Sequence, residues 1–277
     1  MNQFGGSWTE EKMEIVVKYA AAYLTIMNKQ AWVKTIYFDG FAGSGYIESE
    51  GSESVKKGTA LRILDLSDPK PFDVYYFVEL DEEHVLGLYA NLANHPLRKN
   101  IYIQREDCNK KIVALADFLR KHSDHRALVY IDPYGMSVNW SSIESLKGLG
   151  VDLWILVPTG IGINRMLIND GKIADPWLLK LENFLGYSRE EIMKHFYRTL
   201  TRNTLFGEET NVQKEKDAAL LAGELYARKL KQIFSYVSKP FVMRNSQNAI
   251  MYHFMMAANN KTAIKIANEV IEPKYKI

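Results

Sequence analysis

The sequence has little of what would mark a disulfide-stabilised, membrane-spanning or metal-binding protein. Cys108 is the only cysteine among 277 residues, so no disulfide can form within the chain. No apolar run approaches the roughly 18 residues that a membrane-spanning helix requires, and the first residues, MNQFGG, lack the pattern of a signal peptide. The histidines do not occur at the spacings of metal ligands. We therefore expect a cytoplasmic protein without a metal site.

Neither sign of charge dominates the sequence. The 35 lysines and arginines nearly balance 33 acidic residues, which leaves a formal net charge of +2. This balance neither requires nor excludes a nucleic-acid partner. With 47% hydrophobic residues, a chain of this length can bury one large core and carry an added subdomain.

The motif KTIYFDGFAGSG, residues 34–45, is the feature around which the rest of the chain is organised. Its apolar residues 36–38 are typical of a strand buried between helices. The strand ends on Asp39, and glycines follow at positions 40, 43 and 45. Glycines after a buried strand let the backbone approach a bound ligand closely. The sequence therefore predicts a ligand site at the C-terminal end of this strand.

The details of the motif exclude several ligands. A phosphate-binding loop needs Gly-Lys-Ser/Thr after its glycines, and a serine elbow needs glycine where Ala42 stands. A dinucleotide fingerprint should open a helix at once, but Tyr-Ile-Glu-Ser-Glu follows Gly45. Asp39 would also repel a pyrophosphate, which argues against a nicotinamide dehydrogenase. S-adenosylmethionine, which carries an amino acid and no phosphate, fits better.

Strands and helices alternate five times along the first part of the chain, which predicts a parallel sheet covered on both faces. The predicted strands are residues 36–38, 74–78, 101–103, 127–131 and 152–157. Residues 163–238 are predicted to be helical, and residues 241–243 and 249–258 to form a terminal antiparallel hairpin before a last helix at 262–270. We expect a Rossmann-like α/β fold with a core at 1–162, an inserted helical subdomain at 163–238, and completion of the core at 239–277.

Each of the first four predicted strands ends on an acid or is followed by one. In a doubly wound sheet these ends face one crevice. Asp39 would border the methionine part of the cofactor, Glu79 would accept hydrogen bonds from the ribose hydroxyls, and Asp107 would accept one from the adenine amino group. Asp132 would lie nearest the methyl group. Alternatively, these acids only begin turns and cap helices. The residues expected to bind the cofactor are Asp39, Gly40, Phe41, Ala42, Gly43, Gly45, Glu79, Leu80, Asp107, Cys108 and Asp132.

Four segments of the sequence resemble the three-Cys-motif partner (TcmP) family: FDGFAGSG, YFVELD, IDPYG and the closing MYHFMMAANNKTAIKIANEV. The resemblance extends over nearly the whole chain. It implies a fold similar to class I methyltransferases, S-adenosylmethionine as cofactor, and a three-Cys-motif protein of the radical type as partner. The loop at 46–58 departs from ordinary methyltransferases, either as a lid beside the site or as a surface insertion.

Asp132, Pro133 and Tyr134, which precede Gly135, are the predicted catalytic residues. The segment is similar to the D-P-P-Y motif of methyltransferases that act on the amino group of adenine, although the second proline is missing. It is closer to the D-P-F-G of tRNA guanine dimethyltransferases. In both comparisons an exocyclic amine is held by the acid while the aromatic ring stacks on the base. Alternatively, the segment is only a turn with a half-buried tyrosine.

The function predicted from the sequence is methyl transfer from S-adenosylmethionine to an exocyclic amine on nucleic acid. The alternative is a methyltransferase-like module that binds the cofactor or a three-Cys-motif protein without transferring methyl itself. Basic residues of the 163–238 segment would contact phosphates if the substrate is a polynucleotide. They alternate with glutamates, however, which favours a solvated surface over a phosphate-binding one.

Overall fold

The computed structural model describes residues 7–48, 55–204 and 207–275, and its centre is an eight-stranded sheet. Five strands are parallel: β5 (Ile101–Arg105), β4 (Val74–Glu79), β1 (Lys34–Asp39), β6 (His125–Ile131) and β7 (Val151–Val157), in that spatial order. Next to β7 lies the antiparallel β12 (Ile250–Ala258), whose outer edge pairs with β10 (Tyr236–Val237) and β11 (Phe241–Arg244). The Rossmann-like fold with a terminal antiparallel hairpin is therefore confirmed.

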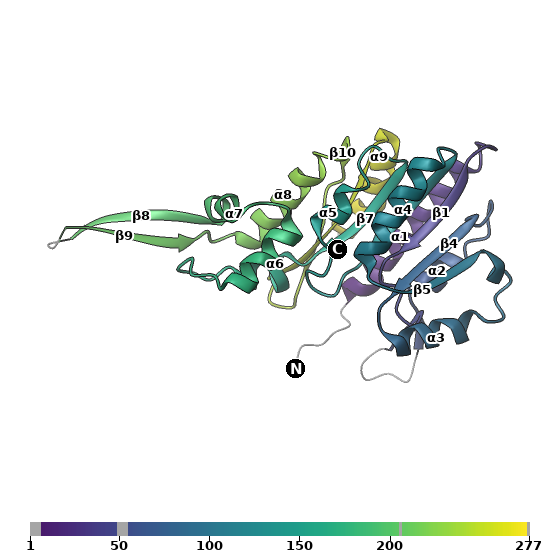
Figure 1. The fold of residues 1–277 in the computed structure, drawn as a ribbon, viewed down its shortest axis with the longest axis horizontal. Helices are drawn as coiled ribbons and strands as arrows, with labels where there is room; N and C mark the ends of the chain where they lie inside the picture. The colour runs from purple at the N-terminus through teal and green to yellow at the C-terminus, as the bar shows by residue number, and fades with distance from the viewer. Residues whose placement is uncertain (1–6, 49–54, 205–206, 276–277) are drawn as a thin grey trace.

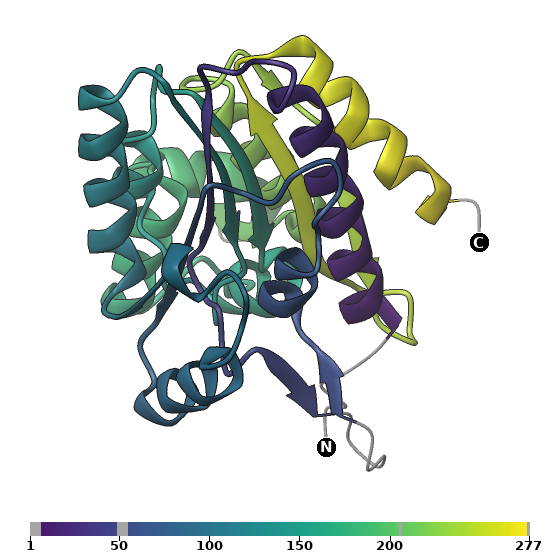
Figure 2. The ribbon, with the colours of Figure 1, turned by 90° about the vertical axis from the view of Figure 1, so that its right-hand side faces the viewer.

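Helices cover both faces of this sheet (Figures 1 and 2). One face carries α1 (Ser7–Met27), α2 (Thr59–Leu64), α3 (Glu82–Leu92) and α9 (Lys261–Ile271). The other face carries α4 (Cys108–Lys121) and α5 (Trp140–Glu144). Short 3-10 turns lie at Arg98–Asn100 and Glu272–Tyr275. None of the described helices is long and apolar enough to cross a bilayer.

The strands of the parallel sheet form because their side chains are apolar on both faces. In β6, Ala127, Val129 and Ile131 face the core under α4 and α5, whereas Leu128 and Tyr130 face the core under α1 and α2. All five are buried. The carboxyl ends of β1, β4, β5, β6 and β7 consequently meet at one edge of the sheet, where the predicted site lies.

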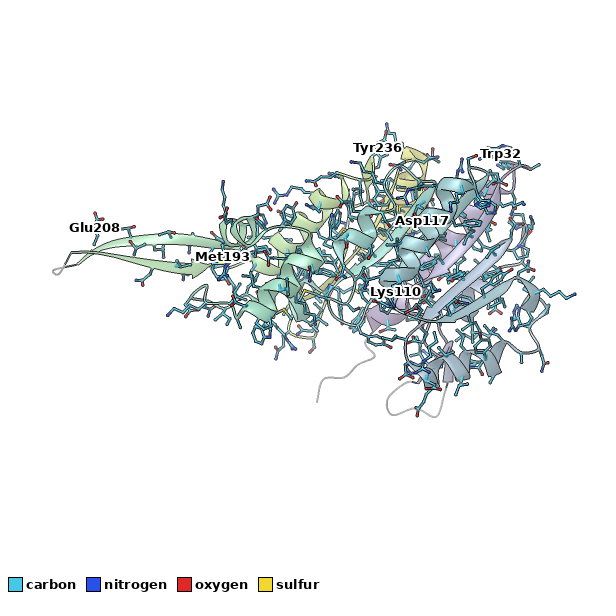
Figure 3. The ribbon with its side chains drawn as sticks, in the orientation of Figure 1. Trp32, Lys110, Asp117, Met193, Glu208 and Tyr236 are labelled. Carbon is cyan, nitrogen blue, oxygen red and sulfur yellow. The ribbon has the colours of Figure 1, made fainter. Side chains whose placement is uncertain are left out.

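The inserted segment is only partly helical, which corrects the prediction for 163–238. A π-helical turn η2 (Thr159–Asn164) leads into α6 (Asp175–Leu185), α7 (Arg189–Phe196) and later α8 (Ala218–Leu230). Between α7 and α8, strands β8 (Tyr197–Thr204) and β9 (Gly207–Lys214) pair as an antiparallel ribbon that projects from the body (Figure 1). Met193 lies at its base and Glu208 near its far end (Figure 3). Threonines and a valine recur along this ribbon, and β-branched residues of this kind favour strands over helices.

The insertion does not have a separate core. Side chains from α6, α7 and α8, among them Phe184, Phe196 and Tyr226, belong to the same apolar cluster as β6 and β7. Tyr236 and Val237 pair with β12, so the end of the predicted insertion is part of the central sheet. The loop after the glycines also has structure: β2 (Tyr46–Glu48) pairs with β3 (Val55–Lys57), and the residues between them lie outside the described ones. This hairpin settles neither the lid nor the insertion interpretation.

The close approach of η2 to β12 gives the first testable prediction. A Cβ atom added at Gly160 would lie 1.7 Å from the carbonyl oxygen of Ile250. We expect Gly160→Ala to lower the free energy of unfolding by about 3 kcal/mol or more, since rigid backbone occupies that space. Gly162→Ala is the matched control, because its Cβ would meet only side-chain carbons at 3.2 Å or beyond. Urea unfolding of both variants measures the difference, and equal stabilities would contradict the prediction.

Candidate cofactor and active site

The glycine loop after β1 is fixed by hydrogen bonds to the end of β1 and to the neighbouring strand β4. The Phe41 N–H donates to Asp39 Oδ1 at 3.1 Å, and the Ala42 N–H donates to the Val78 carbonyl at 3.0 Å. The Gly43 N–H donates to Glu79 Oε2 at 2.9 Å. Gly43 has φ +59°, and a Cβ built there would meet no atom within 4 Å. The loop therefore turns through a left-handed residue beside open space.

Glu79 at the end of β4 is nearly inaccessible to solvent, and both of its carboxylate oxygens accept backbone hydrogens. Oε2 accepts from Gly43, whereas Oε1 accepts from the N–H groups of Leu80 at 2.8 Å and Asp81 at 3.0 Å. Hydrogen bonds to an ionised carboxylate are stronger than those between neutral groups. Glu79 thus holds the β4 end and the glycine loop in one fixed arrangement, with a lone pair left on Oε2 for a ligand hydroxyl.

Asp39 is 1% exposed and lies close to other acids. Burial raises the pKa of its carboxyl from 3.8 to about 7, and the charges of Asp132 and Glu79 act in the same direction. The hydrogen bond from Phe41 opposes the rise in pKa, as does the longer one from the Tyr37 hydroxyl at 3.3 Å. The crevice therefore favours a cation, which would stabilise the ionised form of this carboxyl.

Asp132, which follows β6, is held through one of its two oxygens. Its Oδ2 accepts from the Lys12 ammonium of α1 and from the Tyr130 hydroxyl, the latter at 3.0 Å. The Lys12 side chain is 7% exposed and that of Asp132 is 26% exposed, so the ion pair lies at the inner wall of the crevice. No described residue donates a hydrogen bond to Oδ1. One carboxylate oxygen is thus fixed, and the other remains available to a ligand.

Two adjoining hollows form the crevice, and most of the predicted site residues line them. The first, of about 260 Å³, lies over the glycine loop, and the second, of about 550 Å³, lies at the ends of β4 and β5. His84 and Tyr134 line both hollows. The Tyr134 ring is 71% exposed and meets the Phe41 ring edge-on at 6.4 Å. The predicted residues that line the hollows are Asp39, Phe41, Ala42, Gly43, Gly45, Glu79, Leu80, Asp132 and Tyr134.

Four predicted site residues do not line either hollow. Gly40 packs against Cys108, since a Cβ at Gly40 would lie 2.6 Å from its sulfur, and burial raises the pKa of the Cys108 thiol. Asp107 caps α4, with Oδ1 accepting from the Asn109 backbone at 2.8 Å and from its side-chain amide at 3.0 Å. Pro133 is buried and lines neither hollow. Asp107 therefore caps a helix, as the alternative interpretation of the strand-end acids predicts.

Sequence reasoning missed Lys12, Tyr130, Thr59 and His84. Lys12 is the most consequential, because it is the ionic partner of Asp132. A signal for it existed: Lys12 precedes Ile15, Val16 and Tyr19 on the apolar side of a helix, where a charge is out of place unless it has a partner. Thr59 and His84 line the first hollow from the starts of α2 and α3. Among the described residues, no cluster of His, Cys, Asp and Glu could hold a metal ion.

Comparisons with known proteins support the fold. No family model matches the sequence, and no curated protein matches it. A Legionella pneumophila protein of the DUF519 family superposes with a TM-score of 0.55 at 14% identity, covering 97% of this chain and 92% of its own.

Two further solved structures are similar at lower scores. One is Trm1 from Pyrococcus horikoshii in complex with S-adenosyl-L-methionine (TM-score 0.39, 12% identity, 95% of this chain and 72% of that chain). The other is the DszA carbon methyltransferase (TM-score 0.45, 13% identity, 92% and 55%). At such identities the similarity to the Legionella protein establishes the fold alone. The resemblance to the three-Cys-motif partner family continues to rest on its sequence motifs.

The raised pKa of Asp39 predicts how stability depends on pH. Between pH 3.8 and about 7 the carboxyl is protonated in the folded chain and ionised in the unfolded chain, so folding takes up a proton. The Asp39 contribution to the free energy of unfolding therefore falls as pH rises through this range, by up to about 1.4 kcal/mol per pH unit. Asp39→Asn should remove this slope. Denaturant unfolding from pH 4 to 8 measures it, and parallel curves for the two proteins would refute the assignment.

Proposed function

We propose that the protein is an S-adenosylmethionine-dependent methyltransferase that acts on an exocyclic amine of a nucleobase in nucleic acid. The observation that carries this proposal is the state of Asp132: a carboxylate at the β6 end, fixed through Oδ2 and open at Oδ1, beside a loop-lined crevice. The Rossmann-like fold is consistent with it.

The residues present fit S-adenosylmethionine as a cofactor. The second hollow, of about 550 Å³, has the size of a small-molecule site, which usually ranges over about 300–1,000 Å³, and the first, of about 260 Å³, adjoins it. Asp39 and the glycine loop would hold the amino-acid end, where a cationic ammonium or sulfonium offsets the cost of ionising a buried carboxyl. Glu79 would accept from the ribose hydroxyls, and Leu80, 67% exposed, would contact the adenine. When bound, the cofactor supplies the electrophilic methyl group.

Asp132 and Pro133 would orient the acceptor amine. A primary aromatic amine has two N–H groups, which Asp132 Oδ1 and the carbonyl of Pro133 would accept. Accepting both hydrogens turns the nitrogen lone pair toward the methyl group, which is the alignment that transfer requires. Tyr134, exposed and edge-on to Phe41, would stack on the base that carries the amine.

Lys12 would hold Asp132 in place. Without this partner the Asp132 side chain would be free to rotate, and Oδ1 would no longer be fixed toward the ligand. The ammonium also offsets part of the negative charge of the crevice. Because Lys12 and Tyr130 already occupy Oδ2, Asp132 would accept a hydrogen bond from the ligand through Oδ1. Because Lys12 belongs to α1, the N-terminal helix contributes directly to the geometry of the amine site.

A nucleic-acid acceptor is favoured by the Asp-Pro-Tyr-Gly segment more than by surface charge. Basic residues of the insertion alternate with acids on α7 and on the ribbon, as in Arg189, Glu190 and Glu191. A continuous basic stripe, which would dominate affinity for phosphates, is not evident in the described part of the insertion. We propose that recognition rests on the target base and its immediate neighbours. The alternative, a module that binds a three-Cys-motif protein without methyl transfer, is an outcome of the tests below.

Removal of Glu79 should weaken cofactor binding. Glu79→Ala eliminates an acceptor for the ribose and releases the Gly43 loop, so we expect S-adenosylmethionine to bind more weakly by about 1.5–3 kcal/mol, roughly 10- to 150-fold in Kd. Glu83→Gln, an exposed acid in the first turn of α3, is the matched control. Titration calorimetry measures both. Unchanged affinity in folded Glu79→Ala would remove this residue from the cofactor site.

Substitution of Asp132 should affect turnover more than binding. Asp132→Asn keeps the shape of the side chain but replaces one acceptor oxygen with a donor, so single-turnover methyl transfer should fall about 10²–10³-fold. Lys12→Met should lower the rate as well, and adding it to Asp132→Asn should cost less than the separate effects combined, because the two residues act as one unit. Cofactor affinity should change less than the rate in all three variants.

The assay for these variants offers total RNA and genomic DNA as separate acceptor pools, with Asp117→Asn, an exposed acid on α4, as the control. Equal rates for wild type and Asp132→Asn would exclude the amine-acceptor role. Cofactor binding by the wild type without transfer to either pool would favour the binding-module alternative.

A further inference from the structure

A second hollow site lies on the α4 face of the sheet, away from the crevice. It is a groove of about 390 Å³ between α4 and strands β1, β4 and β5, and its walls are almost entirely apolar. None of the residues that line it lines the crevice at the strand ends. The lining residues are Ile36, Phe38, Val74, Tyr76, Tyr102, Lys111, Ala114, Leu115 and Phe118.

Three aromatic rings stand in a row across the strands on one side of this groove. The Phe38 and Tyr76 rings are 5.7 Å apart with an interplanar angle of 5°, and the Tyr76 and Tyr102 rings are 6.4 Å apart at 22°. Tyr102 is 51% exposed, and Phe118 on the α4 side is 37% exposed. Phe38 is buried, whereas Tyr76 is partly exposed, so the nearly parallel rings of Tyr76 and Tyr102 are the ones on which a flat ring system can stack and bury apolar area.

Lys111 is the only charged residue among those that line the groove. Its ammonium donates to Gln104 Oε1 at 3.3 Å, and no described carboxylate lies within ion-pair distance of it. This differs from its neighbour Lys110, which pairs with Glu106 at 3.2 Å and does not line the groove. The groove therefore combines an aromatic, apolar wall with one cation that a ligand anion would meet.

The edge of the sheet beside the groove is not suited to pairing with another strand. The outward carbonyls of β5 already accept hydrogen bonds: Ile101 from the Arg98 side chain at 3.1 Å, and Ile103 from the Tyr89 hydroxyl at 3.1 Å. Edges covered in this way resist extension of the sheet by a second chain. This disfavours a partner strand from a second copy and leaves the groove itself as the feature to be occupied.

We propose that this groove binds a planar aromatic acid, with the ring system against Tyr76, Tyr102 and Phe118 and the anionic group at Lys111. Its volume falls within the usual range for sites that bury a small organic molecule, about 300–1,000 Å³. The site is independent of the proposed methyl transfer, because it shares no lining residue with the crevice.

Anilinonaphthalene sulfonate, a flat aromatic anion whose fluorescence rises on binding, is the probe that tests this site. We expect saturable binding of one equivalent. Ala114→Trp should fill the groove and weaken binding by about tenfold or more, whereas Val113→Trp, an exposed neighbour outside the lining, should leave it unchanged. Lys111→Met should weaken binding about tenfold, and Lys110→Met should not. The uncharged parent, anilinonaphthalene, should bind more weakly than the sulfonate and be indifferent to Lys111→Met.

Three results would overturn the proposal. The first is an absence of saturable binding. The second is binding that Ala114→Trp and Lys111→Met leave unchanged, which would locate the probe elsewhere. The third is a wild-type dimer in sedimentation velocity that Ala114→Trp dissociates, which would make the groove an interface between copies of the chain.

Discussion

The site depends on how the negative charge gathered at the strand ends is compensated. Three carboxylates approach one crevice, and each is stabilised in a different way. Asp39 is held partly by protonation, Glu79 by three backbone N–H groups, and Asp132 by the Lys12 ammonium and the Tyr130 hydroxyl. Buried charges require such partners, because the desolvation of an isolated carboxylate costs far more than a single hydrogen bond returns.

Because the three carboxylates are stabilised in different ways, they differ in which ligand groups they can bind. A cation beside Asp39 replaces the proton, so this end of the crevice favours a positively charged group. Glu79 is nearly saturated and acts mainly by fixing the glycine loop to β4. Asp132 has one oxygen fixed and one open, which suits it to orient a hydrogen-bond donor. The proposed division of the crevice into methionine, ribose and methyl regions follows from these differences.

Much of the fold could be predicted from the sequence because its strongest signals are local. The buried strands appear as apolar runs such as Ala127–Ile131, and the glycine loop directly follows the strand that ends on Asp39. Parallel pairing then brings acids from separate strands to one edge. The β8–β9 ribbon was missed because its polar residues, interspersed with charges, have no apolar side that would separate strand from helix, although Tyr197, Val212 and the threonines favour a strand.

At the site, too, the sequence predicts only what local patterns indicate. Lys12 and Asp132 are 120 residues apart, so no local pattern links them, although a lysine on an apolar helix face signalled an unidentified partner. Asp107 and Cys108 were assigned to the cofactor because they follow a strand, but whether a strand-end residue caps a helix, packs on glycine or faces the crevice depends on the helix that follows. The aromatic groove joins residues of four elements and has no sequence signature.

The number of protons released when S-adenosylmethionine binds is the most direct test of charge compensation in the crevice. Calorimetric titration at pH 6 in two buffers of different ionisation enthalpy gives this number. The account predicts binding with release of about one proton, because Asp39, with a pKa of about 7 in the free protein, must ionise beside the cationic cofactor. Binding without proton release, or proton release that persists in Asp39→Asn, would contradict the role of Asp39, and an absence of binding would contradict the cofactor site itself.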